Sequence, residues 1–220
     1  MSSEERDLFS VPYEVIAHRA GNNVDAMSAA PSTADAIELD VHLCKGRLEV
    51  RHAKILWPTS LLWEKWHLVP RAHPVPLLEE ILAAADPDVH LWLDLKGLDP
   101  RLAKKVRPLV AQRNPVTVSS KASWMLNVFE GTSVRRFRSV GNRFELLLLE
   151  RLPSRVQVEG VVLHQRLLDA ARVRRLARRS RLVFSWGAES IERAHQLLDD
   201  GVSGLILDNR DLMDRLSASS

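Results

Sequence analysis

The chain has 220 residues, of which 45% are hydrophobic and 27% are charged, and its formal net charge at pH 7 is +3. This composition is typical of a soluble globular protein, and no apolar run approaches the ~18–20 residues that a helix needs to span a bilayer. Because the polar start of the chain is not a secretory signal and the single cysteine, Cys44, excludes an internal disulfide, we expect a cytoplasmic protein that forms one domain over residues 1–220.

Short apolar runs alternate with longer amphipathic stretches along the chain. Eight apolar runs predict strands, at residues 14–17, 36–43, 90–96, 116–119, 135–140, 160–164, 182–186 and 204–208. A short companion strand is expected at residues 48–52. The amphipathic stretches predict helices at residues 77–85, 100–112, 123–129, 171–181 and 190–200, and a short helix closes the chain.

This alternation predicts the fold class. Strands that alternate with helices over short connections form a parallel sheet, and eight such units favour a single α/β domain with the (β/α)8 TIM barrel fold. An open, doubly wound sheet is the alternative. No G-x-G-x-x-G or G-x-x-x-x-G-K-[ST] motif follows any predicted strand, which argues against the nucleotide-binding forms of that sheet.

Polar residues gather where the predicted strands end, which is where the active sites of TIM barrels lie. Charged residues within apolar strands are costly unless they are paired or bind a metal, so this clustering indicates a functional site. The residues concerned are His18, Arg19, Glu38, Asp40, His52, Asp94, Lys96, Ser119, His164, Trp186 and Asp208.

Three carboxylates in this set suit a hard divalent cation. Glu38 and Asp40 are two residues apart on a predicted strand and therefore share a face, and Asp94 would add a third carboxylate from the neighbouring strand. An all-carboxylate set favours Mg²⁺ or Ca²⁺ over Zn²⁺. The alternative is a structural network in which the acids pair with Arg19 and Lys96, and the spacing alone leaves both possibilities open.

Two histidines and two cations complete a set that could hydrolyse a phosphodiester. His18 and His52 could supply a general acid and a general base, although the sequence does not show which is which. Arg19 and Lys96 could hold phosphate oxygens. His42 shares the face of the acidic strand, and its role is open.

The tryptophans receive different predictions. Trp186 ends a predicted strand and is expected in a substrate pocket, whereas Trp92 is expected to face the helices. Trp57, Trp63 and Trp66 are expected to pack a loop over the barrel.

Arginines concentrate in residues 171–181 (ARVRRLARRSR). As a helix, this stretch would place Val173, Leu176 and Ala177 on one face and arginines around the rest. We interpret it as a solvated basic helix, since a single run without interleaved aromatic residues is weak evidence for a nucleic-acid or anionic-membrane surface. No nucleic-acid partner is therefore expected.

The motifs resemble, in order, those of the glycerophosphodiester phosphodiesterases. The resemblance runs from Val15 to Leu212 through IAHRAGN, IELDVHL, LEVRH, PLLEEIL, LWLDLKG, VFSWGAES and GVSGLILDNRDLM. It implies a TIM barrel that uses a divalent metal to hydrolyse a glycerophosphodiester to an alcohol and glycerol 3-phosphate. It also implies acid and base roles for His18 and His52, substrate binding by Arg19, Lys96 and Trp186, and metal binding by Glu38, Asp40 and Asp94.

The sequence departs from the family pattern at several positions. The family's third metal ligand is usually Glu, its lobe after the second strand is larger than the loop expected at residues 54–76, and an acid usually follows each of its two histidines. Here Asp94 stands in place of that Glu. Near the position of the first acid the chain has Asn22 and Asn23, and no acid comes before Asp25, while Ala53 stands in place of the second acid. In the last motif Leu207 replaces a Thr, and the Asp that follows it is retained as Asp208.

The sequence leaves two other functions open. One is phospholipase D-like action on a lysophospholipid or sphingolipid headgroup, in which the tryptophan-rich loop would make transient contact with a lipid surface. The other is a catalytically inactive barrel that binds a phosphorylated metabolite. In each case the expected partner is a small phosphorylated molecule, and the motifs do not specify the headgroup, the metal or the oligomeric state.

Overall fold

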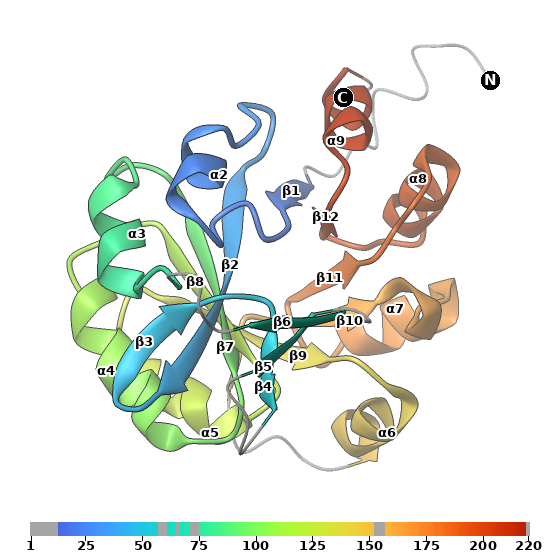
Figure 1. Cartoon of the computed structure of the whole chain (residues 1–220). Helices are drawn as coiled ribbons and strands as arrows, with labels where there is room; N and C mark the ends of the chain where they lie inside the picture. The colour runs from blue at the N-terminus through green and yellow to red at the C-terminus, as the bar shows by residue number, and fades with distance from the viewer. Residues whose placement is uncertain (1–12, 57–60, 65–66, 71–74, 152–156, 219–220) are drawn as a thin grey trace.

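The computed structural model describes residues 13–56, 61–64, 67–70, 75–151 and 157–218, with only the backbone described between residues 54 and 70. Within these residues, eight parallel strands surrounded by helices close into a barrel (Figure 1), which confirms the predicted fold class. The strands are β1 (Glu14–Ala17), β2 (Ala36–Cys44), β7 (Leu91–Lys96), β8 (Val116–Ser120), β9 (Arg135–Val140), β10 (Gly160–His164), β11 (Leu182–Trp186) and β12 (Gly204–Leu207).

The helices follow the strands and form the outer layer. Polar side chains begin several of them: Asp99 precedes Pro100 at the start of α4, and Ser190 accepts a hydrogen bond at the start of α8. The helices are α2 (Val24–Ser28), α3 (Leu78–Ala84), α4 (Pro100–Val110), α5 (Ser123–Leu126), α6 (Arg143–Arg151), α7 (Ala170–Ala177), α8 (Ile191–Asp199) and α9 (Arg210–Ser217), with 3₁₀ turns at Asn127–Phe129 and Gln165–Leu167.

The segment after β2 contains more strands than the sequence predicts. β3 (Arg47–Val50) returns antiparallel to β2 after a turn in which Lys45 and Gly46 have positive φ. β4 (Lys54–Leu56), β5 (Leu61–Glu64) and β6 (His67–Pro70) form a separate antiparallel sheet, so the prediction of a loop over residues 54–76 is wrong at these positions. Trp57 and Trp66 lie outside the described residues, as does the side chain of Trp63.

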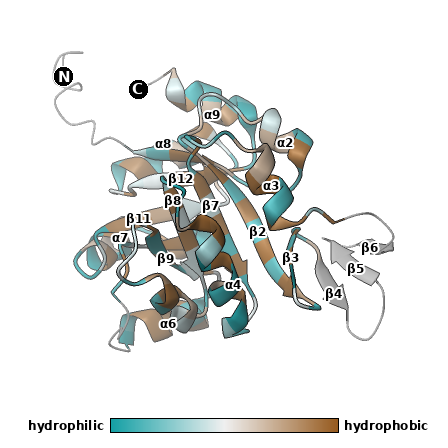
Figure 2. Cartoon of the chain, turned by 90° about the vertical axis from the view of Figure 1, so that its left-hand side faces the viewer, coloured by the Kyte–Doolittle hydropathy of each residue, from teal (hydrophilic) through white to brown (hydrophobic). Residues whose placement is uncertain are grey.

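The alternation along the strands separates two layers of packing. In Figure 2, β2 shows hydrophobic and hydrophilic bands along its length, because Leu39 and Val41 pack outwards against helices while Glu38 and Asp40 belong to the opposite face. Apolar residues on the outward faces of the strands are buried against the helices in two clusters.

A third cluster fills the inside of the barrel. Its members are Ile16, Ala36, Trp92, Phe137, Val162, Phe184 and Ile206. The prediction that Trp92 faces the helices is therefore wrong: Trp92 lies two residues before Asp94 and so shares its inward face. Its ring centroid lies 4.7 Å from that of Phe137 and 5.2 Å from that of Phe184.

Two glycines make room for these rings. A Cβ atom at Gly160 would overlap the ring of Phe137, and one at Gly204 would overlap the ring of Phe184. The aromatic cluster therefore fills the barrel below the polar residues and forms a solid floor for the cavity above it.

The arginine-rich stretch forms α7, whose Val173 and Leu176 are buried as predicted, whereas Ala177 is exposed. Arg172 and Arg175 approach Glu150 of α6 at 3.6 and 3.2 Å, as expected for a solvated helix with surface ion pairs. No helix in the described part of the chain is both long and apolar enough to span a membrane.

Candidate active site

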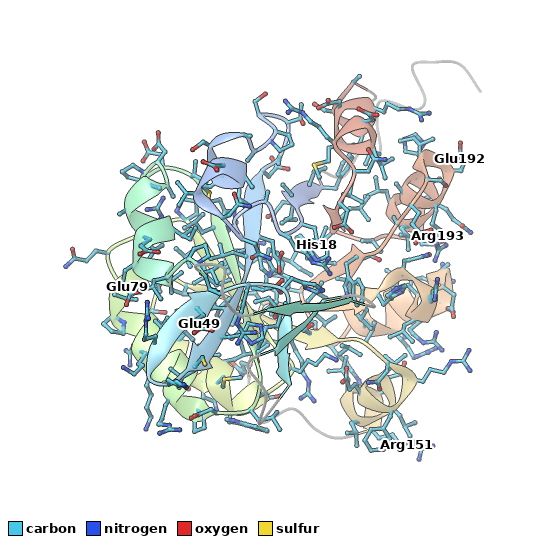
Figure 3. All side chains as sticks on the ribbon, in the orientation of Figure 1. His18, Glu49, Glu79, Arg151, Glu192 and Arg193 are labelled. Atoms are coloured by element: carbon cyan, nitrogen blue, oxygen red, sulfur yellow. The ribbon has the colours of Figure 1, made fainter. Side chains whose placement is uncertain are left out.

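The carboxyl ends of the strands surround a cavity of about 680 Å³. In Figure 3, His18 lies near the centre of the ring of strands, whereas Glu192 and Arg193 lie on the outer helix α8. The cavity brings together seven of the eight predicted site residues, and the eighth, Asp40, is fully buried beside it. The seven are His18, Arg19, Glu38, His52, Asp94, Lys96 and Trp186.

Three carboxylates meet at one side of this cavity. Asp40 and Asp94 are register partners on the adjacent strands β2 and β7, and one oxygen from each of Glu38, Asp40 and Asp94 lies within 4.8 Å of the others. The Nζ atom of Lys96 lies 2.7 Å from Oδ1 of Asp40 and also bonds to Asp94. With all three acids ionised, their three negative charges exceed the positive charges of Lys96 and of Arg19, whose Nε atom lies 3.9 Å from Asp40, so the cluster keeps a net negative charge that favours a cation.

The three acids differ in acidity because their surroundings differ. Burial and the charge of Asp40 raise the pKa of Glu38 to about 7. Burial also opposes ionisation of Asp40, but hydrogen bonds with His52 and Lys96 outweigh it and hold the pKa of Asp40 below its ordinary value. Burial likewise works against the charge of Lys96, whereas the carboxylates hold its pKa above the ordinary value. A bound cation would favour the ionised form of Glu38.

His18 is fixed by a carboxylate from the last strand–helix connection. Its Nδ1 atom bonds to Oδ1 of Asp208 at 2.8 Å, and its Nε2 atom lies 4.0 Å from Oε2 of Glu38. Burial of the ring lowers the pKa of His18, but the hydrogen bond to Asp208 and the charges of Glu38 and Asp208 outweigh burial, so the pKa is raised. The bond at Nδ1 leaves Nε2 as the nitrogen that can exchange a proton in the cavity.

His52 is held in the same way from the other side. Its Nδ1 atom lies 3.0 Å from Oδ2 of Asp40, and its side chain is one-third exposed. The two histidines therefore flank the carboxylate cluster with both Nδ1 atoms engaged by acids. This arrangement suits a pair of groups that accept and donate protons at a substrate held between them.

The connection after β1 shapes the site through its backbone. Arg19 has a φ of 56°, and its N–H donates to Oε2 of Glu38 at 2.7 Å. Its side-chain Nε atom lies 3.9 Å from Asp40 and has no hydrogen-bond partner among the described residues, which leaves a buried donor beside the cavity. Asn22 bonds to the side chain and backbone of Asp40 at 3.1 and 2.8 Å.

Asn22 and Ser119 position two of the three carboxylates, yet the sequence assigns them no such role. Oγ of Ser119 donates to Asp94 at 2.9 Å and accepts a hydrogen bond from Nε1 of Trp92 at 3.0 Å. The sequence signal for Ser119 was its place at a strand end. The signal for Asn22 was its closeness to the first histidine motif.

His42 also lines the cavity, although the sequence left its role open. Burial, together with the charge of Arg51, lowers the pKa of His42 to about 3, so its ring is neutral. Arg51 itself forms a buried ion pair with Glu49 at 3.0 Å, and it lines the cavity without having been predicted to do so.

Trp186, which the sequence places in a substrate pocket, lies at the end of β11 and lines the cavity. Its ring meets the ring of His164 edge to face, with centroids 4.3 Å apart. Gly187, with a φ of 85°, turns the chain tightly against His164. The aromatic wall therefore stands on the β10–β11 side, away from the carboxylates on β2 and β7.

Solved structures show which proteins share this architecture. A glycerophosphodiester phosphodiesterase from Thermotoga maritima matches with a TM-score of 0.73 and 17% identity, over 94% of this chain and 100% of that chain. One from Parabacteroides distasonis matches with a TM-score of 0.70 and 19% identity, over 94% and 97%. The chain has the fold of the glycerophosphodiester phosphodiesterases. The resemblance given by the sequence motifs is thus confirmed for the fold.

A further similar structure carries a ligand. An Oleispira antarctica phosphodiesterase was solved in complex with the product sn-glycerol-3-phosphate, and it matches with a TM-score of 0.71 and 17% identity, over 94% of this chain and 97% of that chain. No protein-family model matches the sequence, and no curated protein does. All these identities are below 20%, so the comparisons establish the fold of the chain and leave its activity to be argued from the site.

Proposed function

We propose that this protein is a phosphoric diester hydrolase that uses a divalent cation, Mg²⁺ or Ca²⁺, to convert a glycerophosphodiester to an alcohol and glycerol 3-phosphate. The observation that carries this proposal is a single cavity in which two acid-anchored histidines flank three converging carboxylates. The phosphodiesterases that share the fold support the same reaction class.

The donor set fits the cation. Glu38, Asp40 and Asp94 would hold it, since they offer only hard oxygen ligands and carry more negative charge than Lys96 balances. When bound, the cation neutralises negative charge on the phosphate and makes the phosphorus more electrophilic.

The remaining groups bind the phosphate and move protons. The side chains of Arg19 and Lys96 both line the cavity, where their positive charges can bind phosphate oxygens. One histidine accepts a proton at Nε2 from the attacking water as the new P–O bond forms. The other donates a proton at Nε2 to the alcohol oxygen as the old P–O bond breaks, so the pair of histidines neither gains nor loses a proton overall.

The walls of the cavity orient the organic part of the substrate. Trp186 lines the cavity on the side opposite the carboxylates, and its apolar ring suits the carbon backbone of a glycerol group. The buried rings of Trp92 and Phe184 close the cavity from below and keep bulk water from reaching the reacting phosphate from that side.

Release of glycerol 3-phosphate from glycerophosphocholine and glycerophosphoethanolamine tests the proposal. The assay compares Mg²⁺, Ca²⁺ and EDTA for the wild type, His18→Ala and a matched control, His195→Ala, whose histidine is exposed on α8. We expect cation-dependent release that is lost in His18→Ala and kept in the control. No release by the folded wild type with either cation would overturn the proposal and favour a binding role.

A further inference from the structure

Exposed apolar side chains gather on one side of the barrel's mouth. Among the described residues, five large hydrophobic side chains are exposed, and four of them follow the ends of β7, β8 and β9. These three strands are neighbours in the barrel, so their connections to the following helices lie next to one another. We call the four residues the apolar rim: Leu98, Trp124, Phe144 and Leu147.

The local backbone turns each member of the apolar rim outwards. Gly97, with a φ of 94°, reverses the chain just before Leu98, which is 67% exposed. In α5, Met125 is fully buried while Trp124 is 51% exposed. In α6, Phe144 and Leu147 are three residues apart and so share one face, and Phe144 is 67% exposed.

The apolar rim borders the catalytic cavity. Gly97 and Lys121 both line that cavity, one residue before Leu98 and three residues before Trp124. Anything that covers the apolar rim therefore lies against the entrance of the cavity. Single exposed apolar residues are normal on protein surfaces, but a set that lies on three adjacent connections and the helices that follow them, beside a cavity, indicates an interaction surface.

Both signs of charge lie beside the apolar rim: Asp99, directly after Leu98, pairs with Arg101 at 2.7 Å, and exposed cations follow the next three strands. Lys121, Arg143 and Arg166 are exposed in the connections that follow β8, β9 and β10. The nearest carboxylate in α6, Glu145, bonds to Nζ of Lys121 at 2.9 Å and to the backbone N–H of Gly141 at 2.6 Å. Exposed aromatic side chains with flanking cations suit the interface of a bilayer that contains anionic lipids.

We propose that the apolar rim docks the barrel, mouth first, on an anionic phospholipid surface. Leu98, Trp124 and Phe144 would enter the headgroup region, while Arg143 and Arg166 would contact lipid phosphates. Docking in this orientation places the cavity entrance beside the headgroups. The proposal rests on exposed residues outside the catalytic set, so it holds or fails separately from the proposed hydrolysis.

Vesicle co-sedimentation of the full chain tests the docking. The vesicles contain phosphatidylcholine alone or phosphatidylcholine mixed with phosphatidylglycerol. The variants are the double substitution Trp124→Ser with Phe144→Ser and a matched control, Val24→Ser, which removes the exposed hydrophobic residue that follows β1. We expect the wild type and the control to sediment with the anionic vesicles and the double variant to bind about tenfold more weakly or worse.

Three results would overturn the docking proposal. The first is a wild type that stays in solution with anionic vesicles, and the second is a control that weakens as much as the double variant. The third is concentration-dependent self-association, seen by light scattering and lost in the double variant, which would assign the apolar rim to a second copy of the chain. Hydrolysis of soluble glycerophosphocholine should be equal in the wild type and the double variant. Its absence in both would count against the proposed function alone.

Discussion

Replacing Lys96 with methionine should make the stability of the fold depend on a divalent cation. The Lys96 ammonium bonds to both Asp40 and Asp94, and Asp40 is fully buried. Removing one partner of a buried ion pair costs about 3–5 kcal/mol. The Lys96 side chain is 32% exposed and Asp40 keeps its bonds to Asn22 and His52. We therefore expect a loss of about 2–3 kcal/mol in the free energy of unfolding, which lowers Tm by about 4–12 °C for a chain of this length.

A cation should reverse this loss because it supplies the positive charge that Lys96→Met removes. At about 100 times its Kd, a bound cation adds about 2.7 kcal/mol of stability, which is similar to the deficit. Thermal unfolding followed by circular dichroism in EDTA, Mg²⁺ and Ca²⁺ measures both effects. Lys104→Met, on the exposed face of α4, is the matched control and should leave Tm nearly unchanged. The reasoning fails if Lys96→Met is as stable as the wild type in EDTA, or if neither cation restores its Tm.

Three further predictions concern the site and its floor. Ser119→Ala removes a hydrogen bond to Asp94, one of the proposed cation ligands, and should weaken divalent-cation binding about tenfold in titration calorimetry; unchanged affinity would contradict this prediction. Asp208→Asn removes a charge that raises the pKa of His18, so the limb of the pH–rate profile that belongs to His18 should move to lower pH; a shift to higher pH would refute the assignment. Gly204→Ala adds a methyl group where the Phe184 ring lies and should lower the free energy of unfolding, measured in urea, by about 1–3 kcal/mol. An unchanged free energy of unfolding would show that the Phe184 ring can move to make room.

The barrel could be predicted because its signals are local. Runs such as residues 36–43 and 160–164 carry strand-like apolar patterns, and short connections between strands and helices restrict the topology. The sheet of β4, β5 and β6 could not be predicted in the same way, since strands of three or four residues have too few positions to show a period of two. The error at Trp92 was different, because its even spacing from Asp94 already placed it inside the barrel.

The site was predictable where chemistry and spacing act together. The separation of two residues between Glu38 and Asp40 gave both the shared face and the expected cluster of acids. The supporting contacts were not predictable. Asn22 reaches Asp40 from a loop, and Ser119 reaches Asp94 from the next strand, so neither contact follows from spacing within one element.

The barrel closes between β1 and β2, and these two strands share fewer register pairs than any other neighbouring pair of the barrel. β1 and β2 share two residue pairs in register, whereas β2 and β7 share six. Two hydrogen bonds that cross this junction end on Glu38, from the backbone N–H of Arg19 to the Glu38 side chain and from that of Gly21 to the Glu38 carbonyl. Amide hydrogens of β1 should therefore exchange with solvent sooner than those of β7. A ligand held jointly by His18 and Glu38 would connect the two strands and slow the exchange of the β1 amides. Hydrogen–deuterium exchange of β1 would then report whether the site is occupied, although the ligand does not contact that strand.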